Sequence, residues 1–152
     1  MKINFRCVEE LLSRVREFSR LRIKYYHVSV EDASRRLREV LSSVLDVKVA
    51  VLFGSVLRRA YVRDLDVGVF MDPEPDLKRI TEISGMLEDA LKIPIDVVPL
   101  NLAPAKLRLK ALLKGVRLIV RDSSLYAFLL SKALSEAMDV DLKIRNAGRH
   151  IT

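Results

Sequence analysis

Apolar residues in the first third of the chain recur with the spacing of an α-helix. One such stripe occupies residues 5–23, and a second occupies residues 30–45. Ser29 precedes the second stripe, and Asp32 comes three residues after Ser29. This is the arrangement of a capping box at a helix N-terminus. The pattern therefore predicts two amphipathic helices, which form an N-terminal helical segment over residues 1–46 that packs on the main domain.

Beyond residue 46 the pattern alternates between short apolar runs and helical stripes. The short runs, rich in β-branched residues, predict strands at residues 47–53, 64–70, 93–99 and 116–120. Helical spacing predicts helices at residues 77–91, 104–115 and 123–138. This order predicts an α/β (α+β) fold in which helices cover a sheet, with the main domain at residues 47–138. Residues 139–152 are polar, and we expect them to form a loose tail.

Length and residue types exclude several classes of protein. The 152 residues correspond to one domain of ordinary size. A single cysteine, Cys7, and two distant histidines exclude a disulfide scaffold and a zinc site. Stretches without charge reach only nine residues, so we expect no membrane-spanning helix. No signal peptide is visible, which predicts a cytoplasmic protein, and 17 arginines without any glutamine hint at a thermophile.

The net charge of +7 does not identify a partner by itself. It suits nucleic acid, the phosphates of a nucleotide, or solubility alone. Two groups of basic residues stand out: Arg58, Arg59 and Arg63 lie in one loop, and Lys106, Lys110 and Lys114 follow one another at helical spacing. The arginines are within reach of a bound triphosphate, whereas the lysine stripe is typical of the solvated side of a helix and fits a polyanionic partner less often.

Three carboxylates interrupt otherwise apolar strands. Asp64 and Asp66 stand two apart on one predicted strand, so they point in the same direction, and Asp96 stands alone on another. Three oxygen donors of this kind suit Mg²⁺, which takes its remaining ligands from water and phosphate. Without a cation the three charges would repel, and we expect at least one carboxyl group to hold its proton more tightly. The sequence therefore predicts a magnesium site.

A glycine and a serine follow the first predicted strand directly. Gly54 allows the backbone to approach a ligand closely, and Ser55 adds a hydroxyl donor. Amide groups at the start of a helical turn favour phosphate. The dipeptide is common, and its value here comes from its place between a strand and the Asp-x-Asp pair.

With Gly54-Ser55, Asp64-Leu65-Asp66 and Asp96 in this order, the stretch from residue 47 to residue 120 resembles the DNA polymerase beta-type nucleotidyltransferases. In size the chain resembles their minimal branch. The chain has Arg59 and Arg63 near positions where many members have glycine and serine, and its spacer between Ser55 and Asp64 is short. These departures leave the choice of nucleotide open.

The resemblance implies a role for each matching residue. Gly54 and Ser55, assisted by Arg58, would bind the phosphates of a nucleoside triphosphate. Asp64 and Asp66 would hold two Mg²⁺ ions, and Asp96 would complete the catalytic one. The implied reaction transfers AMP from ATP, or a nucleotide from another NTP, to a hydroxyl group.

The acceptor stays open at this point. The resemblance implies a HEPN-type toxin as protein partner, which would make the chain an antitoxin. A homo-oligomer that presents the acceptor is a further arrangement, and binding of nucleic acid ranks below nucleotide chemistry. The alternative from another class is an inactive module that keeps the nucleotidyltransferase fold and only sequesters a protein or nucleic acid.

Overall fold

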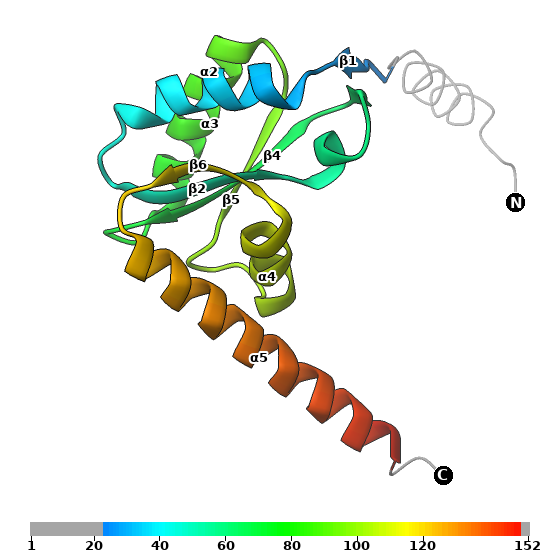
Figure 1. The fold of residues 1–152 in the computed structure, drawn as a ribbon. Coiled ribbons are helices and arrows are strands. Elements are labelled where there is room, and N and C mark those ends of the chain that lie inside the picture. The colour runs from blue at the N-terminus through cyan, green and yellow to red at the C-terminus, as the bar shows by residue number, and fades with distance from the viewer. Residues whose placement is uncertain (1–22, 150–152) are drawn as a thin grey trace, which may run out of the picture.

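The computed structural model describes residues 23–149, which form a mixed sheet with helices on both faces (Figure 1). In this part of the chain the larger sheet has four strands in the order β5-β4-β2-β6. These strands are β2 (Val47–Phe53), β4 (Leu65–Met71), β5 (Ile95–Pro99) and β6 (Val116–Val120). The central β2 pairs antiparallel with β4 and β6, and β4 pairs parallel with β5. The α/β (α+β) class expected from the sequence is confirmed.

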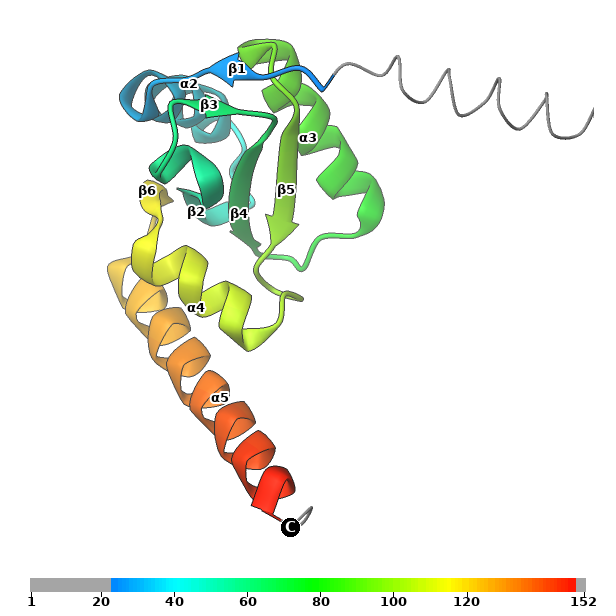
Figure 2. The same cartoon turned by 90° about the vertical axis from the view of Figure 1, so that its right-hand side faces the viewer.

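Two pairs of helices bury the two faces of this sheet. Helices α2 (Val30–Ser42) and α3 (Leu77–Leu91) cover one face, and α4 (Ala105–Lys114) and α5 (Ser123–Arg149) cover the other (Figures 1 and 2). Successive side chains of a strand point to opposite faces of the sheet, so the apolar residues of the strands contribute to both hydrophobic cores. Leu65, Val67 and Val69 of β4 face α2 and α3, whereas Val49 and Val51 of β2 pack with the α4 and α5 side.

The N-terminal segment is only partly within the described residues. The helix expected at residues 5–23 lies outside them. Helix α2 begins after Ser29, whose side chain accepts a hydrogen bond from the backbone N–H of Asp32 at 3.4 Å, as the capping pattern predicts. Its buried residues Leu37 and Leu41 belong to the same core as the sheet. The hydrophobic core therefore continues across the domain boundary that we proposed at residue 46.

The structure also contains two short strands and a helical turn that the sequence did not predict. Strands β1 (Tyr26–His27) and β3 (Tyr61–Val62) form a separate two-stranded sheet, on which the rings of His27 and Tyr61 meet edge to face. The turn is the 3₁₀ helix η1 (Gly54–Leu57), directly after β2. Strands of two residues are too short to produce a recognisable alternation, which is why the sequence does not predict them.

The expectation of a loose tail from residue 139 is wrong, because α5 continues to Arg149. Figures 1 and 2 show its C-terminal end projecting beyond α4. Ion pairs tie this helix to α4: Lys106 Nζ lies 2.7 Å from Asp141 Oδ1, and Arg108 pairs with Glu136. No glycine or proline interrupts the segment before Gly148. None of the helices in residues 23–149 is long and apolar enough to span a membrane.

Arg121 links the end of β6 to the end of α2, and its removal is expected to destabilise the fold. Its Nε donates to the carbonyl of Val47 at 2.7 Å, and its Nη2 donates to the carbonyls of Ser42 at 3.2 Å and Val44 at 3.3 Å. Since these are charge-assisted bonds to carbonyl groups, Arg121→Ala should lower the free energy of unfolding by about 1 to 2 kcal/mol. Urea denaturation measures this change.

The matched control for this prediction is Arg35→Ala. Arg35 pairs with Asp32 on the solvent side of α2, where an exposed ion pair contributes about 0 to 1 kcal/mol. Equal losses of stability in the two variants would contradict the role assigned to Arg121.

Candidate functional site

The C-terminal end of β2 and the N-terminal ends of β4 and β5 lie together at one end of the larger sheet. The predicted site residues lie there. Asp66 is the second residue of β4, and it is in register with Phe53 of β2 on one side and with Asp96 of β5 on the other. Residues in register on paired strands direct their side chains to the same face. Asp66 and Asp96 therefore lie side by side, on the face that α4 and α5 cover. Asp64 is exposed and precedes β4 by one residue.

The glycine at the end of β2 is required by the Asp66 carboxylate. Gly54 has φ +85°, in the region that favours glycine, and it begins η1. A Cβ atom at this position would lie 2.0 Å from Oδ2 of Asp66. The carboxylate thus occupies the space that any other residue would fill. This contact joins the Gly54-Ser55 turn to the Asp-x-Asp pair in a single site.

Burial and neighbouring charge act together on Asp66. Burial raises the pKa of its carboxyl group above the usual range, and the negative charges of Asp64 and Asp96 raise it further. Lys110 of α4 acts in the opposite direction and lowers the pKa. Asp64 and Asp96 are thus close enough to Asp66 for their negative charges to act on it. A cation bound among them would relieve this repulsion.

The donor set suits a hard cation such as Mg²⁺. Three carboxylates provide only oxygen donors, and the negative charges of Asp64 and Asp96 act on Asp66 together. Within residues 23–149 no three His, Cys, Asp or Glu side chains already converge on one point as a metal cage. Mg²⁺ does not require such a cage, since it usually keeps several waters and binds through one or two carboxylates plus substrate phosphates. The residues present therefore fit the ion.

A basic pocket of about 220 Å³ adjoins the carboxylates. Phe53, Gly54 and Leu57 line it from β2 and η1, and three cations complete it, namely Arg58, Lys110 and Lys114. A glycine turn combined with cationic side chains suits phosphate groups as ligands. The arrangement can therefore hold a polyanion next to a cation bound at the carboxylates.

The structure separates the basic residues that the sequence groups together. Of the three loop arginines, only Arg58 lines the basic pocket, while Arg59 and Arg63 are exposed outside it. The Ser55 carbonyl accepts hydrogen bonds from the backbone N–H groups of Arg58 and Arg59, both at 3.0 Å, which closes the turn. Lys110 and Lys114 are residues that sequence analysis did not assign to the site. Their four-residue spacing was visible, but the face of the helix that meets the sheet was not.

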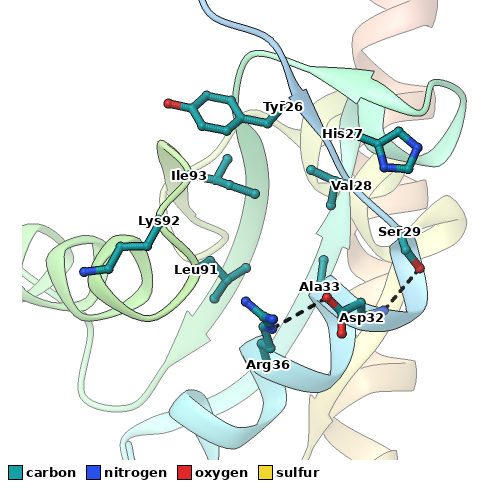
Figure 3. Close-up of a pocket in the computed structure, with 10 residues that line it drawn as sticks. All are labelled: Tyr26, His27, Val28, Ser29, Asp32, Ala33, Arg36, Leu91, Lys92 and Ile93. Carbon is teal, nitrogen blue, oxygen red and sulfur yellow. Dashed lines mark hydrogen bonds and ion pairs between the residues drawn. The ribbon is translucent and has the colours of Figure 1, made fainter.

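A second cavity, of about 290 Å³, lies between β1, α2 and the end of α3 (Figure 3). Asp32 is the one carboxylate that lines it, and Arg35 and Arg36 already pair with that side chain. Tyr26 and Ile93 contribute apolar surface on the opposite side of the cavity from Arg36. Because no group of carboxylates meets there, this cavity is not the candidate for metal-dependent chemistry.

Comparison with solved structures identifies the fold. A chain of a toxin-antitoxin complex with AMP-PNP is 19% identical, with a TM-score of 0.66, over 78% of this chain and 97% of that chain. A chain of the tri-AMPylated Shewanella oneidensis HEPN toxin in complex with its MNT antitoxin is 18% identical, with a TM-score of 0.65, over 80% of this chain and 97% of that chain. At such low identity these matches establish a shared fold.

Comparison of the sequence with protein families identifies its family. No curated protein matches the chain in sequence. The model of the family described as "Polymerase beta, Nucleotidyltransferase" matches residues 35–124, which are 90 of the 152 residues. The matched range includes the Gly54-Ser55 turn, Asp64, Asp66 and Asp96. With this match over more than half of its length, and with the carboxylates and the glycine turn meeting at one sheet edge, the chain belongs to the polymerase beta nucleotidyltransferase family.

Proposed function

We propose that the chain is a Mg²⁺-dependent nucleotidyltransferase of the minimal type, which transfers AMP from ATP to a hydroxyl group. One observation carries the proposal: the Asp66 carboxylate lies in register with Asp96 and fills the space above Gly54. The metal-binding and phosphate-binding halves of the site are therefore adjacent. Membership of the nucleotidyltransferase family supports the same reaction.

Each residue of the site has a role in this proposal. Gly54, Ser55 and Arg58 bind and orient the phosphates, with the Ser55 hydroxyl as donor and the Arg58 guanidinium as cation. Asp64, Asp66 and Asp96 would hold Mg²⁺ through their carboxylate oxygens, with two ions expected. Bound Mg²⁺ supplies Lewis-acid stabilisation of the charge on the entering and leaving oxygens.

The proposed reaction is an in-line displacement at the α-phosphorus. The acceptor oxygen forms a bond to the α-phosphorus, and the bond from that phosphorus to the oxygen bridging the α- and β-phosphates breaks. Pyrophosphate leaves with the bonding electrons, and the proton of the acceptor hydroxyl passes to Asp96 or to solvent. Asp96 is suited to this because it is exposed at the edge of the sheet, where an acceptor can approach.

We propose a HEPN-type protein as the acceptor, in a cytoplasmic toxin-antitoxin pair. The support is the likeness in fold to chains of complexes described as a tri-AMPylated HEPN toxin with its MNT antitoxin. Residues 23–149 form one helix-covered sheet and a separate two-stranded sheet of β1 and β3. In this proposal the acceptor hydroxyl belongs to another molecule, either a HEPN-type protein or a second copy of the chain.

A labelling experiment tests this function. The protein is incubated with Mg²⁺, a HEPN-type protein, and ATP that carries the label on either the α- or the γ-phosphate. We expect label from the α-phosphate on the HEPN-type protein and none from the γ-phosphate. Label from the γ-phosphate would indicate a kinase instead. A stable complex of the two proteins with no transfer would favour the inactive binding module.

A further inference from the structure

The two-stranded sheet of β1 and β3 has one face on the core and one face toward solvent. On the core side, Val62 is buried and Tyr26 packs against the hydrophobic cluster that α2 and α3 share with the larger sheet. Residues opposite each other on paired strands share a face, and so do alternate residues along one strand. The register pairs His27 with Tyr61, and Figure 3 shows His27 pointing away from Tyr26. His27 and Tyr61 therefore belong to the face that the core does not cover.

Four residues define this outer face, namely Tyr25, His27, Tyr61 and Arg63. Tyr25 stands two residues before His27, and Arg63 stands two residues after Tyr61, so the alternation assigns both to the outer face. The tyrosine rings are open to solvent, since Tyr25 is 58% exposed and Tyr61 is 62% exposed. The rings of His27 and Tyr61 meet edge to face, with their centroids 5.1 Å apart. The outer face thus presents aromatic rings on which another planar group can stack.

The charge around the outer face is positive. Residues 54–63 contain three arginines and no acidic residue, and residues 23–30 contain no acidic residue either. Arg59 and Arg63 are exposed, and neither makes an ion pair within residues 23–149. Phosphate groups complement such guanidinium groups, and the net charge of +7 favours a polyanionic partner. Exposed rings beside arginines are the combination that binds single-stranded nucleic acid, through stacked bases and neutralised phosphates.

We propose that the outer face of the β1–β3 sheet binds single-stranded nucleic acid, with bases stacked on the tyrosine rings and phosphates on the neighbouring arginines. The face lies next to the carboxylates, because Tyr61 comes three residues before Asp64, and an extended chain of that length spans about 10 Å. A bound strand would therefore lie beside the end of the sheet where the acceptor approaches. Binding to this face requires neither Mg²⁺ nor a triphosphate, so the inference does not depend on the proposed function.

Fluorescence anisotropy of a labelled oligonucleotide tests the inference. The probes are an oligouridine RNA of about twelve nucleotides and an RNA duplex of the same length, both in EDTA, so that no metal occupies the carboxylates. We expect the wild type to bind the single strand more tightly than the duplex, whose bases cannot stack on the protein. Tyr61→Ala should weaken binding of the single strand about ten-fold, because a base loses its stacking partner. Tyr61→Phe should retain the affinity, since the ring remains.

The matched control for the ring is Phe128→Ala. Phe128 is 61% exposed and belongs to α5, which lies well away from β1 in Figures 1 and 2, so this variant should bind the strand as the wild type does. Arg63→Ala tests the phosphate contact. It should weaken binding and reduce the slope of log affinity against log salt concentration by about one.

Two results would overturn the inference, namely no binding of the single strand by the wild type at physiological ionic strength, and equal affinities of the wild type and Tyr61→Ala. If no strand binds and Tyr61→Ala instead weakens a complex with a HEPN-type protein, the outer face is a protein interface. Melting temperatures show whether Tyr61→Ala folds. If it does not, Arg63→Ala decides, and a wild-type affinity and salt slope in that variant would contradict the proposal. None of these results affects the transfer reaction, which the labelled ATP tests separately.

Discussion

Asp66→Asn is expected to lower the rate of AMP transfer by about a thousand-fold or more. Asparagine keeps the size of the side chain but removes the negative charge that would hold Mg²⁺ between Asp64 and Asp96. Initial rates of transfer from α-labelled ATP measure the effect. The matched control is Asp89→Asn, an exposed position of α3 on the far side of the sheet, which should keep the wild-type rate. A rate for Asp66→Asn within ten-fold of the wild type would contradict the role of this residue.

The same substitution should not destabilise the metal-free protein. Burial, followed by the charges of Asp64 and Asp96, raises the pKa of Asp66 in the folded state. A raised pKa means that this group favours folding at low pH, and that the contribution is lost as the pH rises through the folded-state pKa. At neutral pH the ionised group therefore opposes folding. In EDTA, Asp66→Asn should melt at or above the wild-type temperature, which separates lost catalysis from lost structure.

Gly54→Ala is expected to have the second largest effect. The added Cβ would lie 2.0 Å from Oδ2 of Asp66, and a φ of +85° is unfavourable for alanine. The backbone strain costs about 1 to 2 kcal/mol. Either the carboxylate or the turn must shift, and a misplacement of about 1 Å can reduce a rate about a hundred-fold. Rates of AMP transfer and chemical denaturation measure both effects.

The control for Gly54→Ala is another glycine-to-alanine change. Gly85 lies within α3, and a Cβ there would meet no heavy atom within 4 Å. Gly85→Ala should raise stability by up to about 1 kcal/mol, because alanine favours the helix, and should leave the rate unchanged. If Gly54→Ala also keeps the wild-type rate, the close approach of Asp66 to the turn has no part in the reaction.

Local pattern predicts which face of its strand Asp66 occupies. Period-two alternation along β4 places Asp66 opposite to the buried Leu65 and Val67, and a glycine after an apolar strand marks the turn. The pairing of β4 with β5, which brings Asp96 beside Asp66, follows from the sheet order. That order is a non-local property, so the sequence supported it only through the resemblance to a family.

Other features depend on packing between distant segments and were not predictable. The place of Lys110 in the lining of the basic pocket depends on how α4 lies on the sheet, which the periodicity of the helix does not determine. The C-terminal half of α5 is polar enough to suggest a tail, yet ion pairs from Lys106 and Arg108 tie it to α4. Local composition underestimates a helix whose stability comes partly from contacts with another element.

A crystal structure of the protein with Mg²⁺ and a non-hydrolysable ATP analogue tests the central claim most directly. The claim is that Asp64, Asp66 and Asp96 bind the metal while the Gly54-Ser55 turn binds the nucleotide. We predict Mg²⁺ density at these carboxylates, with the α-phosphate next to it and the terminal phosphates in the basic pocket. A nucleotide bound elsewhere, such as in the cavity beside Asp32 and Arg36, with no metal at the carboxylates, would contradict the account.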